Sequence, residues 1–173
     1  MQIDQQLSAR RKTLAKRMVF IRICFQVTLI ATLLNSAAAL FNVNKMFFPF
    51  GLSSVQFSFE RGLYLLEKGD AKGFVTFILV FVLLLALFCL AYFMLGRSVS
   101  WAWGITAFLT MDFIITAALF FTRMSLALYL IDLFLHCFVI IQGFRATRTV
   151  RALEVLPEKE IEGDPFEEFR NED

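Results

Sequence analysis

Four long apolar runs divide the chain and are separated by shorter polar segments. They cover residues 23–41, 74–95, 101–121 and 124–144. A run of about 20 apolar residues is long enough to cross the hydrocarbon core of a bilayer as an α-helix. No water reaches the backbone there, so each run must satisfy its own hydrogen bonds and therefore forms a helix. The pattern predicts an all-α fold, an integral membrane four-helix bundle.

The first loop, residues 42–73, is too apolar at its start to be a plain linker. Ser53 and Gln56 have the spacing of a capping box, which predicts a short helix ending at about Glu67. Alternation of apolar and polar side chains over residues 55–59 is instead typical of a strand. We expect the helix, and we expect it to be interfacial, lying on the outer leaflet over the mouth of the bundle. Such a helix is either a lid or a surface for a partner, or a segment that only packs against the bundle.

The composition argues against a soluble fold. Of the 173 residues, 58% are apolar and only 18% are charged. A soluble domain of this length would expose large apolar patches and aggregate. In a bilayer, lipid solvates the outer face of each helix and removes this problem.

Lysine and arginine residues gather on one side of the predicted bundle. With four spans, the segments of that side next to the membrane carry ten of them, against five on the other side. Because cytoplasmic loops carry the excess of these residues, we expect both termini in the cytoplasm. The small size and short loops favour a bacterial plasma (inner) membrane. The basic residues expected to set the topology and to contact lipid headgroups are Arg10, Arg11, Lys12, Lys16, Arg17, Arg22, Arg145, Arg148 and Arg151.

The charge pattern also divides the chain into three parts. Residues 1–22 form a basic cytoplasmic segment, and residues 23–144 form the four-helix domain. Residues 145–173 are expected to extend the last helix into the cytoplasm and to end in an acidic tail. The final twenty residues carry nine acidic side chains, which predicts a solvated, disordered tail or, as an alternative, a docking motif.

The first run admits a second interpretation. A basic segment, an apolar stretch and then the sequence SAAA at residues 36–39 resemble a cleavable signal peptide. The basic segment is long for a signal peptide, and the apolar run is close to a full span. We therefore expect an uncleaved first helix.

Three ionisable side chains interrupt the last two runs: Asp112, Asp132 and His136. Placing an Asp at the centre of a membrane helix costs about 2.5–3.5 kcal/mol, so each group needs partners. Asp132 and His136 are four residues apart and share one helical face with Tyr129. The last two runs are joined by a very short turn, so Asp112 can reach the same depth from the facing helix. The sequence predicts a buried polar cluster of Asp112, Asp132, His136 and Tyr129, holding either an ion pair or a shared proton.

Polar and small residues in the other runs predict further contacts. Thr32, Asn35 and Ser36 in the first run lie at a depth from which they can donate hydrogen bonds to the cluster. Small residues let helices approach closely, and Gly104 and Ala107 are expected to do so in the third run. The second run is bulky throughout, so we expect it to face lipid most.

Three functions remain open for the polar cluster. The leading expectation is a polar clasp that fixes helix pairing or holds a partner helix, in a non-enzymatic membrane subunit or interaction protein. The alternative is a proton or ion relay in a transporter, which with four spans requires a homo-oligomer or a larger membrane complex. A metal site or membrane enzyme is the third, but one histidine and no glutamate in any run form a weak metal signature.

Motifs for other chemistry are missing from the sequence. It contains no nucleophile elbow, zinc-protease motif, P-loop or dinucleotide fingerprint. We therefore expect no cofactor and no metal. The basic segments are short and adjoin the membrane, so we expect the bilayer as a partner and no nucleic acid.

Overall fold

The computed structural model describes residues 2–41, 51–119 and 126–156, and these residues contain helices and turns but no strand. The helices are α1 (Gln2–Leu40), α2 (Ser53–Glu67), α3 (Ala71–Met94), α4 (Val99–Leu119) and α5 (Leu126–Glu154). Four of them, all except α2, are long and apolar enough to cross a membrane. The predicted all-α, four-helix membrane fold is confirmed. The acidic tail and the turn between the last two spans lie outside the described residues.

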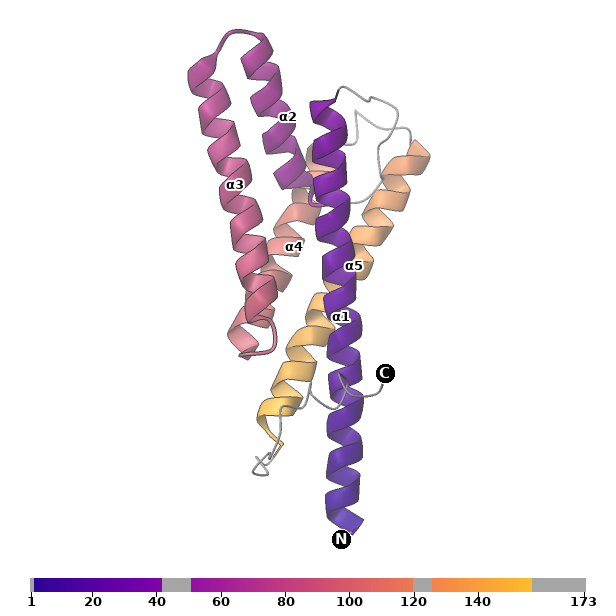
Figure 1. The fold of residues 1–173 in the computed structure, drawn as a ribbon. Helices are drawn as coiled ribbons and strands as arrows, with labels where there is room; N and C mark the ends of the chain where they lie inside the picture. Colours follow the sequence, from indigo (N-terminus) through magenta and orange to yellow (C-terminus); the bar gives the residue numbers. More distant parts are fainter. Residues whose placement is uncertain (1, 42–50, 120–125, 157–173) are drawn as a thin grey trace.

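The helices form two groups that meet near the middle of the molecule (Figure 1). α1 and α5 run side by side, with the start of α1 and the end of α5 at the same end of the bundle. α2 and α3 form an antiparallel hairpin that leans away from them, and α4 links the hairpin to α5. The hairpin turn is fixed by Asp70, whose side chain accepts a hydrogen bond of 2.9 Å from the Gly73 amide.

The interior between the groups is packed by aromatic and aliphatic side chains. Phe25 of α1 and Phe88 of α3 are fully buried and meet edge to face, with ring centroids 6.5 Å apart. Phe88 also packs on Phe108 of α4, with centroids 5.7 Å apart. All of α3 is described, and only Phe88 and Ala91 of its residues are buried. Phe81, Leu84 and Leu85 are partly buried against the core, and many other α3 side chains are exposed. This agrees with the expectation that the second span faces lipid most.

α2 covers the predicted range but differs from the prediction in its capping and its position. The capping residue is Leu52, and no side chain of the capping box bonds to the helix start, so the predicted capping box is wrong. Most side chains of the first turns, from Ser53 to Ser58, are buried, whereas Leu66 and Glu67 at the other end are exposed. α2 therefore enters the bundle with its N-terminus and leaves it with its C-terminus, rather than lying along its mouth.

α4 and α5 approach each other closely at Gly143. A Cβ atom added there would lie 3.3 Å from the Thr106 Cα and 2.7 Å from its Oγ1. Gly104, predicted to be such a contact, has nothing within 4 Å of an added Cβ, and Ala107 is exposed. The prediction is wrong for these two residues because the buried face of α4 carries Ala102, Thr106 and Leu109 instead, and Thr106 is the residue that lies against Gly143.

Polar contacts tie the helix ends together at the basic end of the bundle. The Arg22 guanidinium donates a 2.7 Å hydrogen bond to the carbonyl of Leu95, which follows the last residue of α3. Glu154 of α5 accepts a 3.1 Å hydrogen bond from the Val99 amide at the start of α4. Each contact places a charge of the stabilising sign at a helix end.

Candidate functional site

The structure brings three ionisable side chains together where α4 meets α5. Asp112 lies on α4, and Asp132 and His136 lie one turn apart on α5; each is at most 3% exposed. The Nε2 atom of His136 is 3.1 Å from Asp112 Oδ2, and its Nδ1 atom is 3.2 Å from Asp132 Oδ1. We call Asp112, His136 and Asp132 the triad. Its histidine lies between two carboxylates from different helices.

The Asp112 carboxylate also caps the N-terminus of α2. The amides of Ser53 and Ser54 donate to its two oxygens at 3.0 and 2.7 Å, and the Ser54 hydroxyl donates to Oδ1. The first amides of a helix have no intrahelical acceptor and carry a partial positive charge. A buried carboxylate from α4 thus replaces the cap that the sequence predicted within α2 itself.

Hydrogen-bond accounting favours one charge state for the triad. The Nδ1 atom of His136 is also 2.9 Å from the Asp132 carbonyl oxygen, which can only accept, so this nitrogen carries a proton. Asp112 already accepts three hydrogen bonds from α2, and a carboxylate has about four acceptor positions. The fourth is filled if Nε2 donates as well. The geometry is therefore satisfied by a histidinium between two carboxylates, with the α2 N-terminus offsetting the excess negative charge.

The polar residues predicted in the first span support α2 rather than the triad directly. Thr32 accepts a 2.7 Å hydrogen bond from the Leu52 amide, and Asn35 donates to the Gln56 side chain at 3.3 Å. Ser36 donates to the Thr32 carbonyl. Within the described part of the chain, neither Thr32 nor Ser36 bonds to a triad residue. These side chains satisfy polar groups at the start of α2 that would otherwise be buried unpaired.

Tyr129 lies on the same side of α5 as the triad, nearer the start of the helix. It is 8% exposed, and its hydroxyl donates a 3.1 Å hydrogen bond to the Ala117 carbonyl. Between Tyr129 and the triad, Thr116 of α4 donates to the Asp112 carbonyl and lies 3.4 Å from His136 Nε2. Polar contacts between α4 and α5 therefore extend over more than one turn.

The triad is a poor metal site. Over residues 2–41, 51–119 and 126–156, no group of three His, Cys, Asp or Glu side chains is arranged so that it could hold a metal ion. The Asp112 oxygens point at α2 amides, and donors at those positions occupy the lone pairs that a metal would need.

The basic residues predicted to contact headgroups separate into two sets. Arg22 binds the Leu95 carbonyl, as described above, while Lys12 and Arg151 are exposed and Arg11 is half-buried. The others line a groove between α1 and α5: Arg10, Lys16, Arg17, Arg145 and Arg148.

Two features of these polar regions were not foreseen from the sequence. The first is the contact of Ser53 and Ser54 with Asp112. The first turn of α2 contains no acidic residue of its own, and this absence was the signal that its amides need an acceptor from elsewhere. The other is Gln142, which is 1% exposed on α5. The sequence signal for Gln142 was a polar amide side chain near the end of the fourth apolar run.

Comparison of the chain with known protein families, with curated proteins and with solved structures finds no match.

Proposed function

We propose that this protein is a non-enzymatic membrane subunit in which the triad clasps the α2–α3 hairpin to the rest of the bundle. The observation that carries this proposal is the set of hydrogen bonds around Asp112. Its carboxylate joins α2 to α4 and, through His136, to α5. A carboxylate with its acceptor positions filled from within the chain suits a structural clasp better than a site that must bind and release a ligand.

The hairpin held by the clasp is the part of the molecule best suited to contact a partner. α3 exposes large apolar side chains along most of its length, among them Leu79, Leu83, Leu87 and Phe93. It leans away from α1 and α5 (Figure 1), so a helix of a second copy or of a larger membrane complex can pack along it. Within a bilayer such packing competes with lipid, so a firmly held hairpin gives a partner a defined surface.

We also propose that the basic end of the bundle faces the cytoplasm of a bacterial cell, across its plasma (inner) membrane. The shared position of the start of α1 and the end of α5 supports placing both on one side (Figure 1). The excess of arginine and lysine there supports the cytoplasmic side. Reporter domains fused after Glu154 and within the α2–α3 turn test this orientation, and activity of a periplasm-specific reporter after Glu154 would contradict it.

A proton relay is the second candidate, and one observation favours it. Both ring nitrogens of His136 face carboxylates, so the triad can pass a proton between Asp112 and Asp132. Polar side chains continue along the buried first part of α2, where Gln56 donates a 2.9 Å hydrogen bond to Glu60, one turn further along the helix. Such chains of ionisable and polar groups are typical of proton pathways.

One pair of substitutions separates the two functions. Asp132→Asn and His136→Ala remove triad partners, and Thr76→Ala, on the exposed face of α3, is the matched control. For a clasp, both triad variants lower the unfolding temperature and the oligomer content of native-membrane extracts, while proton flux in proteoliposomes equals that of the control. Loss of flux with unchanged stability would replace the clasp by the relay. A purely monomeric wild-type extract would contradict the subunit proposal.

A further inference from the structure

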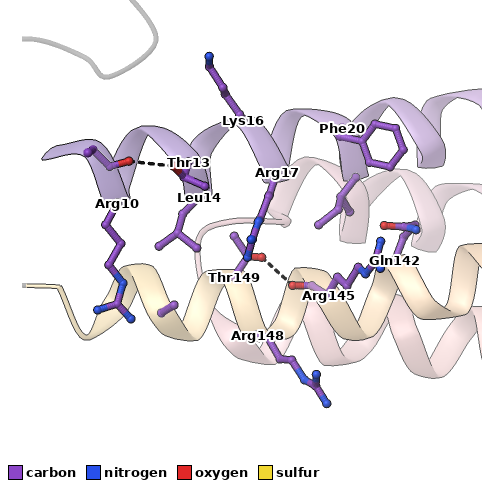
Figure 2. A pocket seen from close by; sticks show the side chains of 13 residues that line it. Arg10, Thr13, Leu14, Lys16, Arg17, Phe20, Gln142, Arg145, Arg148 and Thr149 are labelled. Carbon is purple, nitrogen blue, oxygen red and sulfur yellow. Dashed lines mark hydrogen bonds between the residues drawn. The ribbon is translucent and has the colours of Figure 1, made fainter. Parts of the chain in front are cut away.

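A groove of about 1150 Å³ opens between α1 and α5 at the basic end of the bundle (Figure 2). The residues of α1 that line it recur every three or four positions, as do those of α5, so each helix contributes one face. Leu14 and Ile21 provide buried apolar walls. The groove is formed by residues other than the triad, and its charged side chains are arginine and lysine.

Positive side chains from both helices meet across this groove. In Figure 2, Arg17 extends from α1 towards α5, and Arg145 extends along α5 towards Gln142. Lys16 and Arg148 line the outside of the groove and point away from it. No acidic residue is among the described residues that line the groove. Charges of one sign on both helices repel, and an anion bound between the helices would offset this repulsion.

Gln142 lies at the base of the groove and adds a second, independent observation. Its side chain is buried, and neither Nε2 nor Oε1 has a hydrogen-bond partner among the described residues. A buried amide without hydrogen-bond partners destabilises the fold. Its Nε2 group donates and its Oε1 atom accepts. A ligand that satisfies both atoms must therefore offer an acceptor oxygen and a hydrogen-bond donor, such as a hydroxyl, within reach of each other.

The depth of the groove matches that of lipid headgroups. Arg145 directly follows the last residue of the predicted fourth apolar run. Just before it, Phe144 packs edge to face on Trp103 of α4, with ring centroids 5.8 Å apart. Tryptophan is enriched at the boundary between hydrocarbon and headgroups. The groove is also far larger than one phosphate ion needs, and its apolar walls suit a glycerol and the start of an acyl chain.

We propose that the groove between α1 and α5 binds the phosphate of an anionic phospholipid with a hydroxylated headgroup. Arg17 and Arg145 bind the phosphate oxygens, for which the planar guanidinium is well suited. Gln142 donates to a phosphate oxygen and accepts from the headgroup hydroxyl. A soluble phosphate compound offers the same chemistry and is the other possible source of the ligand. This inference is independent of the function of the triad.

Native mass spectrometry of the full-length, delipidated protein tests the proposal. The probes are phosphatidylglycerol, phosphatidylethanol, which has the same charge but no headgroup hydroxyl, and zwitterionic phosphatidylcholine. We expect phosphatidylglycerol to bind most tightly and phosphatidylcholine least. Gln142→Leu and Arg145→Ala should each weaken phosphatidylglycerol binding at least tenfold. Arg97→Ala, which removes a charge at the same end but outside the groove, should leave binding within twofold of wild type.

Inorganic phosphate, compared with chloride at equal ionic strength, distinguishes the two sources. A rise in unfolding temperature with phosphate that Gln142→Leu abolishes, without preferential lipid binding, would assign the groove to a soluble phosphate compound. Equal lipid binding by wild type, Gln142→Leu and Arg145→Ala would overturn the proposal. So would equal losses in Arg97→Ala and Arg145→Ala, since binding would then follow total charge. Circular dichroism and the unfolding temperature of each variant establish that it is folded, and Arg17→Ala replaces any variant that is not.

Discussion

The triad and the groove are both polar regions beside α5, but their hydrogen bonding is opposite. At His136, each ring nitrogen has an acceptor, and Asp112 receives donors from α2. At Gln142, two buried polar atoms have no partner within the described chain, and arginines of α1 and α5 line the same groove. The hydrogen bonds of the triad are complete, whereas the groove contains polar atoms that no described residue satisfies.

The difference shows how a buried polar group should be interpreted in a membrane protein. The cost of burial alone does not separate a structural role from a binding role, because both regions contain side chains that are at most 3% exposed. The balance of donors and acceptors does separate them. A balanced cluster stabilises helix packing, and an unbalanced one indicates a ligand.

The largest effect is expected from removing the clasp. Asp112→Ala leaves the first amides of α2 without an acceptor and leaves His136 with one carboxylate. Breaking a buried charge pair on one side costs about 3–5 kcal/mol. We expect a loss of this size in the free energy of unfolding, measured by denaturation in mixed micelles.

The matched control is Glu154, a second carboxylate that accepts a hydrogen bond from the start of a helix distant from it in sequence. Glu154→Ala removes the exposed hydrogen bond to the Val99 amide, and a cap of this kind is worth about 0.5–2 kcal/mol. If Asp112→Ala costs no more than Glu154→Ala, burial adds nothing to the cap and the triad is not a clasp.

A smaller effect is expected at the contact that sets the spacing of α4 and α5. Gly143→Ala places a methyl group against the Thr106 backbone, whereas Gly104→Ala adds one in open space. Overpacking costs about 1–3 kcal/mol, so Gly143→Ala should lower the unfolding temperature. Gly104→Ala should leave it unchanged or raise it slightly, because alanine favours a helix more than glycine does. Gly143 lies next to the groove, but Gly143→Ala should also weaken the triad, because it moves α4 and α5 apart. Equal stability of the two alanine variants would show that this spacing is not critical.

The smallest change in the free energy of unfolding is expected at Gln142, and its sign should depend on whether anionic lipid is present. In delipidated protein, Gln142→Leu removes an unpaired buried amide and should stabilise the fold by about 1 kcal/mol. With phosphatidylglycerol present, wild type should become the more stable, because binding to the folded state adds to stability. Destabilisation under both conditions would mean that Gln142 has a partner within the chain and that the two regions are alike.

The sequence could predict the membrane fold because the apolar runs are long and lipid leaves the backbone no alternative to helices. Matching depths along neighbouring helices also indicated which ionisable groups lie near each other, and His136 does lie within 3.2 Å of a carboxylate oxygen of both aspartates. Local patterns sufficed here because these contacts join consecutive helices.

The position of α2 could not be predicted in the same way. The limits of the helix follow from local sequence, but its depth follows from the bonds of Ser53 and Ser54 to Asp112, 59 and 58 residues away. Gly104 and Gly143 illustrate the same limit. Both are small, but only rotation of the helices relative to each other decides that Gly143 is the close contact. The missing partners of Gln142 also become visible only when every neighbour is known.

The long separation between α2 and its cap has a consequence for biosynthesis. Ser53 and Ser54 leave the ribosome well before Asp112 has been added to the chain. Until then their amides have no buried acceptor, and entry of this turn into the lipid would cost several kcal/mol for each unsatisfied group. The start of α2 must therefore stay at the watery edge of the translocation machinery until α4 arrives, so the last step of assembly is the inward movement of a segment made early.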